Sequence, residues 1–450
     1  MDVYETKISD ILASQSFLAK HPAASQMGSD LYSSAVNSVS EIILRQRFSG
    51  QYVSAATSLN FGAQSSFFLT PGSIMNGLIL SCSVVLPRYT RAPDFWLLNA
   101  IDSVELIISG SSSVQSLKVN GRTQMDMIMA TLDSNKLQLL RETNGFIDLQ
   151  AAGATVKASI PLHLFFSSIE MESLFGCDTS TLSSQIILNI RWRNATNVFS
   201  GDSTNAIVLP TGFNDLYMRV AEQVSIDNSF ALSNELRQDP NLVYSIPGTY
   251  LQSYSQVVNV SSLSTENMVN LTSMPSGALQ AILCSVQEVS REGLASTQGL
   301  INPWAAFESI RLLYNGVELY RADSSEEIRL MNAAMTDKDN GINLQWINHR
   351  VTTAAATPVL FQETPVVIIP FANQVSKVLR ERRSENTKSY SGGSLQFNFT
   401  IKPSFIYRDN TNPIVSTSTY ANSTGDYRLN FTFINAALYE ISQRSVSLNM

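Results

Sequence analysis

Three histidines are the residues of this chain that could ligate a metal or act as general bases: His21, His163 and His349. A metal site of the cupin type brings several histidines and a carboxylate together inside one barrel. The three histidines are instead spread over the N-terminal region and the two halves of the sequence. His163 lies beside Pro161 in an apolar segment, which favours a core or rim position over a ligand position. We therefore predict no metal site in either half.

The sequence also lacks the local motifs of common enzyme classes. No G-x-S-x-G nucleophile elbow lies near a histidine, and neither a P-loop nor a G-x-G-x-x-G motif occurs. The three cysteines, Cys82, Cys177 and Cys284, are too few for a disulfide scaffold and fit small buried residues. We predict that the protein is not an enzyme and uses no cofactor.

A basic segment at residues 377–388 could contact nucleic acid. It holds five basic and two acidic residues, a local charge of +3. The whole chain has a formal net charge of −7, whereas proteins that wrap nucleic acid are normally basic. A solvated surface is the other interpretation of this segment. We expect no specific nucleic-acid partner.

The composition indicates which elements position these residues. Charged residues make up 15% of the 450-residue chain and hydrophobic residues 44%, with abundant Ser, Thr and Asn, which suits β-sheet with polar loops. The first residues, MDVYETKISDIL, do not resemble a secretory signal, and the longest apolar stretch, Gly77–Leu86, is too short to span a bilayer. We expect the chain to fold inside a cell.

A repeat of about 200 residues sets the expected architecture. Five pairs of similar segments occur in the same order, with offsets of 202, 206, 209, 209 and 213 residues. Representative pairs are Leu69 with Leu271, Ile101 with Phe307, Ile160 with Ile369, Ile186 with Leu395, and Leu216 with Leu429. We predict two homologous domains in tandem: an N-terminal helical arm at 1–45, domains at 46–228 and 248–450, and a linker at 229–247.

The matched segments have the alternation of half-buried strands. In 186–192 and 395–401 every second residue is apolar, which is typical of antiparallel sheets with one buried face. Asn315-Gly316 predicts a two-residue hairpin between two such strands.

Helices and loops are expected between these strands. Helices are predicted at 124–141 and 324–334, the second capped by Ser324 with Glu327. The segments 193–212, 335–363 and 403–426 are predicted to be loops or surface decorations, and the arm carries apolar helical faces that could pack on its own domain or on a neighbour.

The order of these features resembles the double jelly-roll major capsid proteins of the adenovirus and tectivirus lineage, which includes virophages, polinton-like viruses and large DNA viruses. The segments that carry the resemblance are Val104–Ile108 with Val119-Asn120-Gly121, Ile310–Tyr320, Ile160–Phe166, Val366–Phe371 and the closing strands. The resemblance implies an all-β fold of two tandem eight-stranded jelly-roll β-sandwiches, with the helical arm and a few short helices.

The resemblance also implies a function. Such proteins form homotrimers, which are pseudo-hexagonal capsomers that tile the icosahedral shell of a double-stranded DNA virus. The implied location is the virion, after synthesis in the host cell. The implied partners are neighbouring capsomers, penton and minor capsid proteins, and an internal membrane reached through the arm.

Opposite charges in corresponding loops suggest how subunits could meet. The segment 167–183 has three acidic residues and no base, against the basic segment 377–388 of the second domain. Complementary charge between neighbouring subunits would determine which domain faces which. The candidate inter-subunit residues are Glu170, Glu172, Asp178, Arg380, Arg382 and Arg383.

A tandem jelly-roll carbohydrate-binding protein or spike is the alternative function. It would place clustered aromatic residues in the loops of both domains, whereas Trp304 and Trp346 lie near loops of the second domain only. A jelly-roll enzyme is disfavoured by the small number of histidines.

Overall fold

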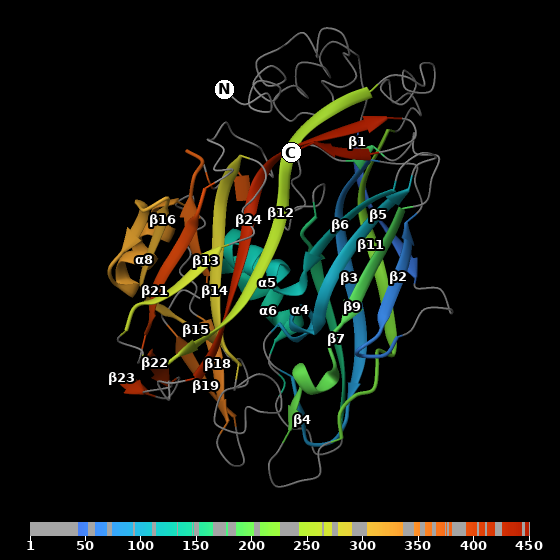
Figure 1. Ribbon diagram of the computed structural model, residues 1–450. Coiled ribbons are helices and arrows are strands. Elements are labelled where there is room, and N and C mark those ends of the chain that lie inside the picture. The colour runs from blue at the N-terminus through green and yellow to red at the C-terminus, as the bar shows by residue number, and fades with distance from the viewer. Residues whose placement is uncertain are drawn as a thin grey trace.

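The computed structural model describes most of the chain between residues 44 and 449 (Figure 1). The longest stretches outside the described residues are 1–43, 165–176, 226–242, 290–303, 336–345 and 380–392, and shorter gaps interrupt other loops. The predicted helical arm at 1–45 therefore lies almost entirely outside the described residues. The described part forms two β-sandwiches, here called roll 1 and roll 2, which lie side by side.

Roll 1 has two antiparallel sheets that face each other, each with four main strands. The first sheet has the order β1 (Leu44–Tyr52), β11 (Asp215–Ser225), β3 (Ile74–Leu86), β7 (Ala154–Leu162), and the short β8 (Cys177–Asp178) also pairs with β3. The second sheet has the order β2 (Gln64–Leu69), β9 (Ile186–Trp192), β5 (Ile101–Ser109), β6 (Val114–Asn120).

Roll 2 repeats this topology. Its first sheet has the order β12 (Val243–Val260), β24 (Gly425–Ser442), β14 (Leu279–Glu288), β20 (Val366–Pro370), with β15 (Trp304–Ala305) and β25 (Val446–Asn449) added. Its second sheet has the order β13 (Asn267–Leu271), β21 (Leu395–Ile401), β16 (Phe307–Tyr314), β17 (Val317–Ala322). The predicted fold, two tandem eight-stranded jelly rolls, is confirmed.

Strand pairing aligns the two rolls residue by residue. Ile101 pairs with Trp192 and Phe307 pairs with Ile401, and in both rolls the register shifts at the next position. The offsets of 206 and 209 residues therefore relate residues that have the same place in the two rolls.

The offset of the closing strand is wrong by two residues. Cys82 pairs with Leu216 and its counterpart Cys284 pairs with Phe431, which gives an offset of 215 instead of 213. A two-residue slip keeps every side chain on the same face, so the alternating pattern could not reveal it.

Each roll encloses an apolar core made by the inward residues of its two sheets. In β9 the apolar residues at alternate positions are buried, as the alternation predicted. In roll 2 the rings of Phe397 and Phe431 meet edge to face across the two sheets, with centroids 5.1 Å apart. Burial of such rings is the main stabilising term of a sandwich.

The helix predicted at 124–141 is two helices, α5 (Gly121–Thr131) and α6 (Ser134–Asn144). The Asn120 side chain accepts a hydrogen bond from the Thr123 backbone N–H at 2.7 Å, which caps α5 three residues earlier than predicted. The short α4 (Trp96–Ala100) precedes β5.

The hairpin and cap predicted in roll 2 are confirmed. Asn315 and Gly316 both have positive φ, 49° and 80°, as a type I′ turn between β16 and β17 requires. The helix α8 (Ser325–Met335) begins after Ser324, whose hydroxyl accepts from the Glu327 N–H at 3.2 Å.

Parts of the predicted loops are ordered elements. A separate four-stranded sheet in roll 2 has the order β18 (Trp346–Val351), β19 (Ala356–Phe361), β22 (Phe405–Asp409), β23 (Asn412–Ser418). In roll 1, β4 (Thr90–Arg91) pairs with β10 (Ser200–Gly201). The prediction that 193–212 is an exposed loop is wrong for Val198 and Phe199, which are buried.

Candidate functional site

The contact between the two rolls is the candidate site that the described residues define. Helix α5 of roll 1 lies between the rolls and packs on the outer face of the β24–β14–β20 part of roll 2 (Figure 1). Nearly every residue of α5 is buried, which is typical of a helix covered on all sides.

Apolar side chains of both rolls form one continuous cluster at this contact. Met127 and Ile128 of α5 belong to the same buried cluster as Leu283, Ile368 and Ile434 on the outer face of roll 2. The core of roll 1 therefore extends to the surface of roll 2. Such a contact resembles a domain interior and keeps the two rolls together.

Polar groups complete the contact. The hydroxyls of Thr123 and Thr432 lie 3.0 Å apart, and the Ser285 hydroxyl donates to Asp126 Oδ2 at 2.9 Å. Arg122 Nε lies 3.4 Å from Asp126 Oδ1.

Burial shifts the pKa of both charged groups at this contact. Burial raises the pKa of the Asp126 carboxyl to about 7, against the opposing effects of Arg122 and of the Ser285 hydrogen bond. Burial lowers the pKa of the Arg122 guanidinium to about 9, an effect that Asp126 opposes. The pKa values of both side chains therefore depend on the other charged groups near this contact.

The surfaces that correspond to this contact elsewhere in the chain are exposed. Helix α8 follows the last strand of the second sheet of roll 2, as α5 does in roll 1, but lies on the far side of roll 2 (Figure 1). Its Leu330 is 71% exposed, and Ala333 and Ala334 are exposed too. In roll 1, the outer face of the first sheet presents Val85, which is 45% exposed.

The predicted inter-subunit residues are not tested by the structure. Glu170, Glu172, Arg380, Arg382 and Arg383 lie outside the described residues. Asp178, in β8, pairs through its backbone with Ile74 of β3, and its side chain is not described.

His163 is a buried residue that connects two elements of roll 1. Its side chain is fully buried, and its backbone N–H and C=O bond to the amide of Gln124 at 2.6 and 2.7 Å. It therefore ties the end of β7 to α5, in agreement with the predicted core position.

Among the described residues, no group of three or more His, Cys, Asp or Glu side chains could hold a metal ion. Cys82 and Cys284 are buried thiols, and burial raises the pKa of each, so both are poor nucleophiles. No helix in the described part of the chain is long and apolar enough to cross a membrane.

The charged residues at the contact between the rolls were not predictable as a group from the sequence. Arg428 is far in sequence from Arg122 and Asp126, and it comes near them only because α5 packs on the other roll. The one available signal was two charges, Arg122 and Asp126, four residues apart at the start of a helix that is otherwise apolar.

No family model and no curated protein matches this sequence. Solved structures do match. PBCV-1 VP54, fitted into the virophage Sputnik, is 12% identical with a TM-score of 0.64, covering 91% of this chain and 98% of that one. The mavirus major capsid protein is 11% identical with a TM-score of 0.53, covering 90% of both chains.

The Faustovirus major capsid protein is similar over a comparable length. It is 7% identical with a TM-score of 0.56, and the match covers 90% of this chain and 91% of that one. At such low identity the match is one of fold, extending over both rolls. The protein therefore has the double jelly-roll fold that is found in these viral major capsid proteins.

Proposed function

We propose that the protein is a major capsid protein, which forms homotrimeric pseudo-hexagonal capsomers that tile the icosahedral shell of a double-stranded DNA virus. The proposal is supported by the packing of roll 1 on roll 2 through α5. Within one chain, a helix on one side of a roll covers the outer sheet face of the next roll. Three copies can repeat this contact six times and close a ring with six similar sides.

The surfaces left over in one chain match this arrangement. Helix α8 with Leu330 forms one free end of the tandem, and the outer face of roll 1 with Val85 forms the other. In a ring, α8 of one copy would lie on the outer face of roll 1 in the next copy. Roll 1 of the next copy would thereby cover the exposed apolar side chain of Leu330.

We propose the following location and partners for such a capsid protein. The protein would reside in the virion, contact neighbouring capsomers, penton and minor capsid proteins, and have no catalytic role. The arm at 1–45 would contact its own domain, a neighbour or an internal membrane. The domain boundaries at 46–228 and 248–450 remain part of the proposal.

The charged loops add a way of orienting subunits in the ring. Acidic residues of 167–183 in one copy would face basic residues of 377–388 in the next. Changing Arg380, Arg382 and Arg383 together to Glu should prevent trimer formation, while each monomer keeps its far-ultraviolet circular dichroism. Normal trimers from this variant would rule out the contribution of these loops.

The experiment that tests the main proposal is the mass of the purified native protein by light scattering, with negative-stain images of the same sample. A stable particle with three times the 49.5 kDa of the chain, hexagonal in projection, would support the capsomer. A monodisperse monomer at micromolar concentration would contradict it. That result would favour the carbohydrate-binding or spike alternative, which a glycan array would then examine.

A further inference from the structure

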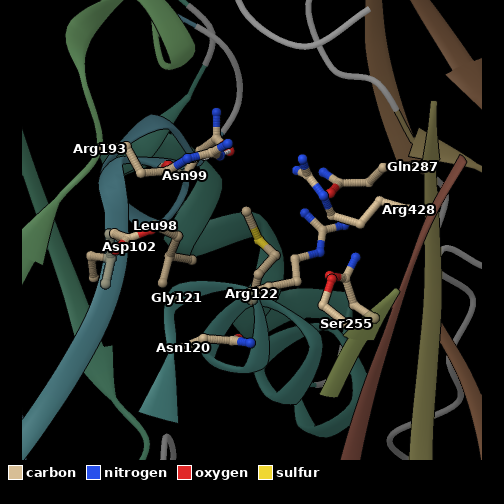
Figure 2. Close-up of a pocket in the computed structure, with 13 residues that line it drawn as sticks. Leu98, Asn99, Asp102, Asn120, Gly121, Arg122, Arg193, Ser255, Gln287 and Arg428 are labelled. Atoms are coloured by element: carbon tan, nitrogen blue, oxygen red, sulfur yellow. Dashed lines mark hydrogen bonds between the residues drawn. The ribbon is translucent and has the colours of Figure 1, made fainter. Parts of the chain in front are cut away.

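A cavity of about 140 Å³ lies at the junction of the two rolls, beside the first turn of α5. Roll 1 contributes Arg122 and Arg193 to its wall, and roll 2 contributes Arg428 and Asn430. Figure 2 shows the three arginine side chains reaching toward the same space from different elements. The volume is sufficient for a few water molecules or one small polyatomic ion.

The wall of this cavity carries excess positive charge. Three arginines and one carboxylate, Asp102, line it, and the Asp126 carboxylate lies 3.4 Å from Arg122 Nε behind the wall, which leaves a formal charge of +1 when both carboxylates are ionised. The Asp102 carboxylate is itself shared, because it lies 3.7 Å from Arg191 Nε outside the cavity. After burial, the charge of Arg428 is the largest influence that lowers the pKa of Arg193. Cations gathered at a partly buried place are unfavourable unless an anion accompanies them.

A buried amide gives a second indication of a ligand. Asn430 lines the cavity and is 4% exposed. Its Oδ1 accepts a hydrogen bond from the Ser255 hydroxyl at 3.2 Å, and its Nδ2 is buried without a hydrogen-bond partner among the described residues. A buried donor without an acceptor costs free energy, and an oxygen atom in the cavity would satisfy it.

The internal repeat shows what roll 2 places at the same position. Arg193 and Lys402 are equivalent, since each follows a paired strand and each donates its backbone N–H to a corresponding carbonyl, at 2.8 and 2.9 Å. Lys402 Nζ lies 3.5 Å from the Glu326 carboxylate, at the start of α8. At the start of α5 the chain has Arg122 instead, so roll 1 brings a cation where roll 2 brings an anion.

We propose that the cavity binds a small tetrahedral oxyanion of the phosphate or sulfate class, which links Arg122 and Arg193 of roll 1 to Arg428 of roll 2. The anion takes the place that the Glu326 carboxylate has in roll 2. The N-terminal turn of α5 adds a favourable dipole, and Asn430 adds an amide donor. Because its ligands come from both rolls, the anion stabilises their packing in the folded chain, whatever the oligomeric state.

The test is a titration of the full chain with inorganic phosphate at constant ionic strength. Thermal unfolding and isothermal calorimetry are measured for the wild type, for Arg428→Gln and Arg193→Gln, and for the control Arg311→Gln, an arginine of roll 2 remote from the cavity. We expect saturable binding of one phosphate per chain in the wild type and control, with a Tm that rises with the logarithm of phosphate concentration above Kd. Each cavity variant should bind at least tenfold more weakly.

Three further measurements distinguish the ligand and control for folding. Sulfate should bind as phosphate does. Weaker binding of adenosine monophosphate would identify the free ion as the ligand, whereas tighter binding would identify a phosphoester. Arg428→Lys keeps the charge and provides a folded comparison if Arg428→Gln does not fold. The absence of saturable binding in the wild type would overturn the proposal, as would equal phosphate affinity in the wild type and the cavity variants.

Discussion

Leu330 offers the sharpest test of the proposed ring, because it is an apolar side chain on the face of α8 that is exposed in a single chain. It is 71% exposed on α8. In the ring it would be buried against roll 1 of the next copy. Changing Leu330 to Glu should therefore weaken the trimer without affecting the fold of the monomer.

The size of the effect follows from the exposed fraction. Full burial of a leucine side chain contributes about 1.5–3 kcal/mol, and 71% of this is about 1–2 kcal/mol for each contact. A closed trimer contains three such contacts, so about 3–6 kcal/mol is lost, or roughly a 10²–10⁴-fold weaker trimer. The buried charge of Glu makes this a lower bound.

Sedimentation velocity over a range of protein concentrations measures the loss, with thermal unfolding of each sample as a check on the monomer. Met268 on β13 is the matched control, since it is 55% exposed on the second sheet of roll 2. In the corresponding sheet of roll 1, Phe68 remains 39% exposed although roll 1 packs on roll 2, so this face is expected to lie outside the ring. Equal trimer formation by Leu330→Glu and Met268→Glu would refute the α8 contact.

Three other expectations concern the stability of the monomer. Because burial raises the pKa of Asp126 from 3.8 to about 7, the contribution of its neutral carboxyl to folding stability is complete at acid pH and is lost as the pH rises through 7. Urea unfolding between pH 4 and 8 should show this loss in the wild type and not in Asp126→Asn. Phe397→Ala empties a site that is 0% exposed and should cost about 3–5 kcal/mol in chemical denaturation. Asn120→Ala removes the cap of α5 and should cost about 1 kcal/mol in the same assay, whereas Asn120→Asp should retain most of the stability.

The parts of the fold that local sequence determines were predictable. The alternation in 186–192 and 395–401 matches the bounds of β9 and β21, and Asn315-Gly316 adopts the positive φ angles that its hairpin needs. Ser324 caps α8 at the expected spacing. In each case the residues that determine the element lie within a few positions of one another.

Features that depend on distant contacts were not predictable. Phe199 lies in a polar segment that reads as an exposed loop, but it is buried beside the rings of Trp96 and Phe61, which come from elsewhere in roll 1. The break between α5 and α6 near Leu132 has no glycine or proline to mark it. The cavity lined by Arg122, Arg193 and Arg428 was not predictable for the same reason, because its residues come from both rolls.

The outer faces of the first sheets of roll 1 and roll 2 differ in composition. This difference indicates that the contact between the rolls within one chain and the proposed contact between chains differ in strength. Positions that hold Leu283, Val366 and Ile368 in roll 2 hold Ser81, Lys157 and Ser159 in roll 1. The face that α5 covers within the chain is thus apolar at these positions, whereas the face offered to the next copy is polar at them and has Val85 as an exposed apolar residue.

A polar face can remain in water until a partner arrives, so the monomer can fold before it assembles. Interfaces of this kind are wetter and weaker per unit area than domain interiors, and geometry and charge determine which partner is chosen. We therefore expect trimers to dissociate to folded monomers in moderate denaturant, well before the two rolls separate. Loss of the trimer and of the buried tryptophan environment at the same denaturant concentration would contradict this order.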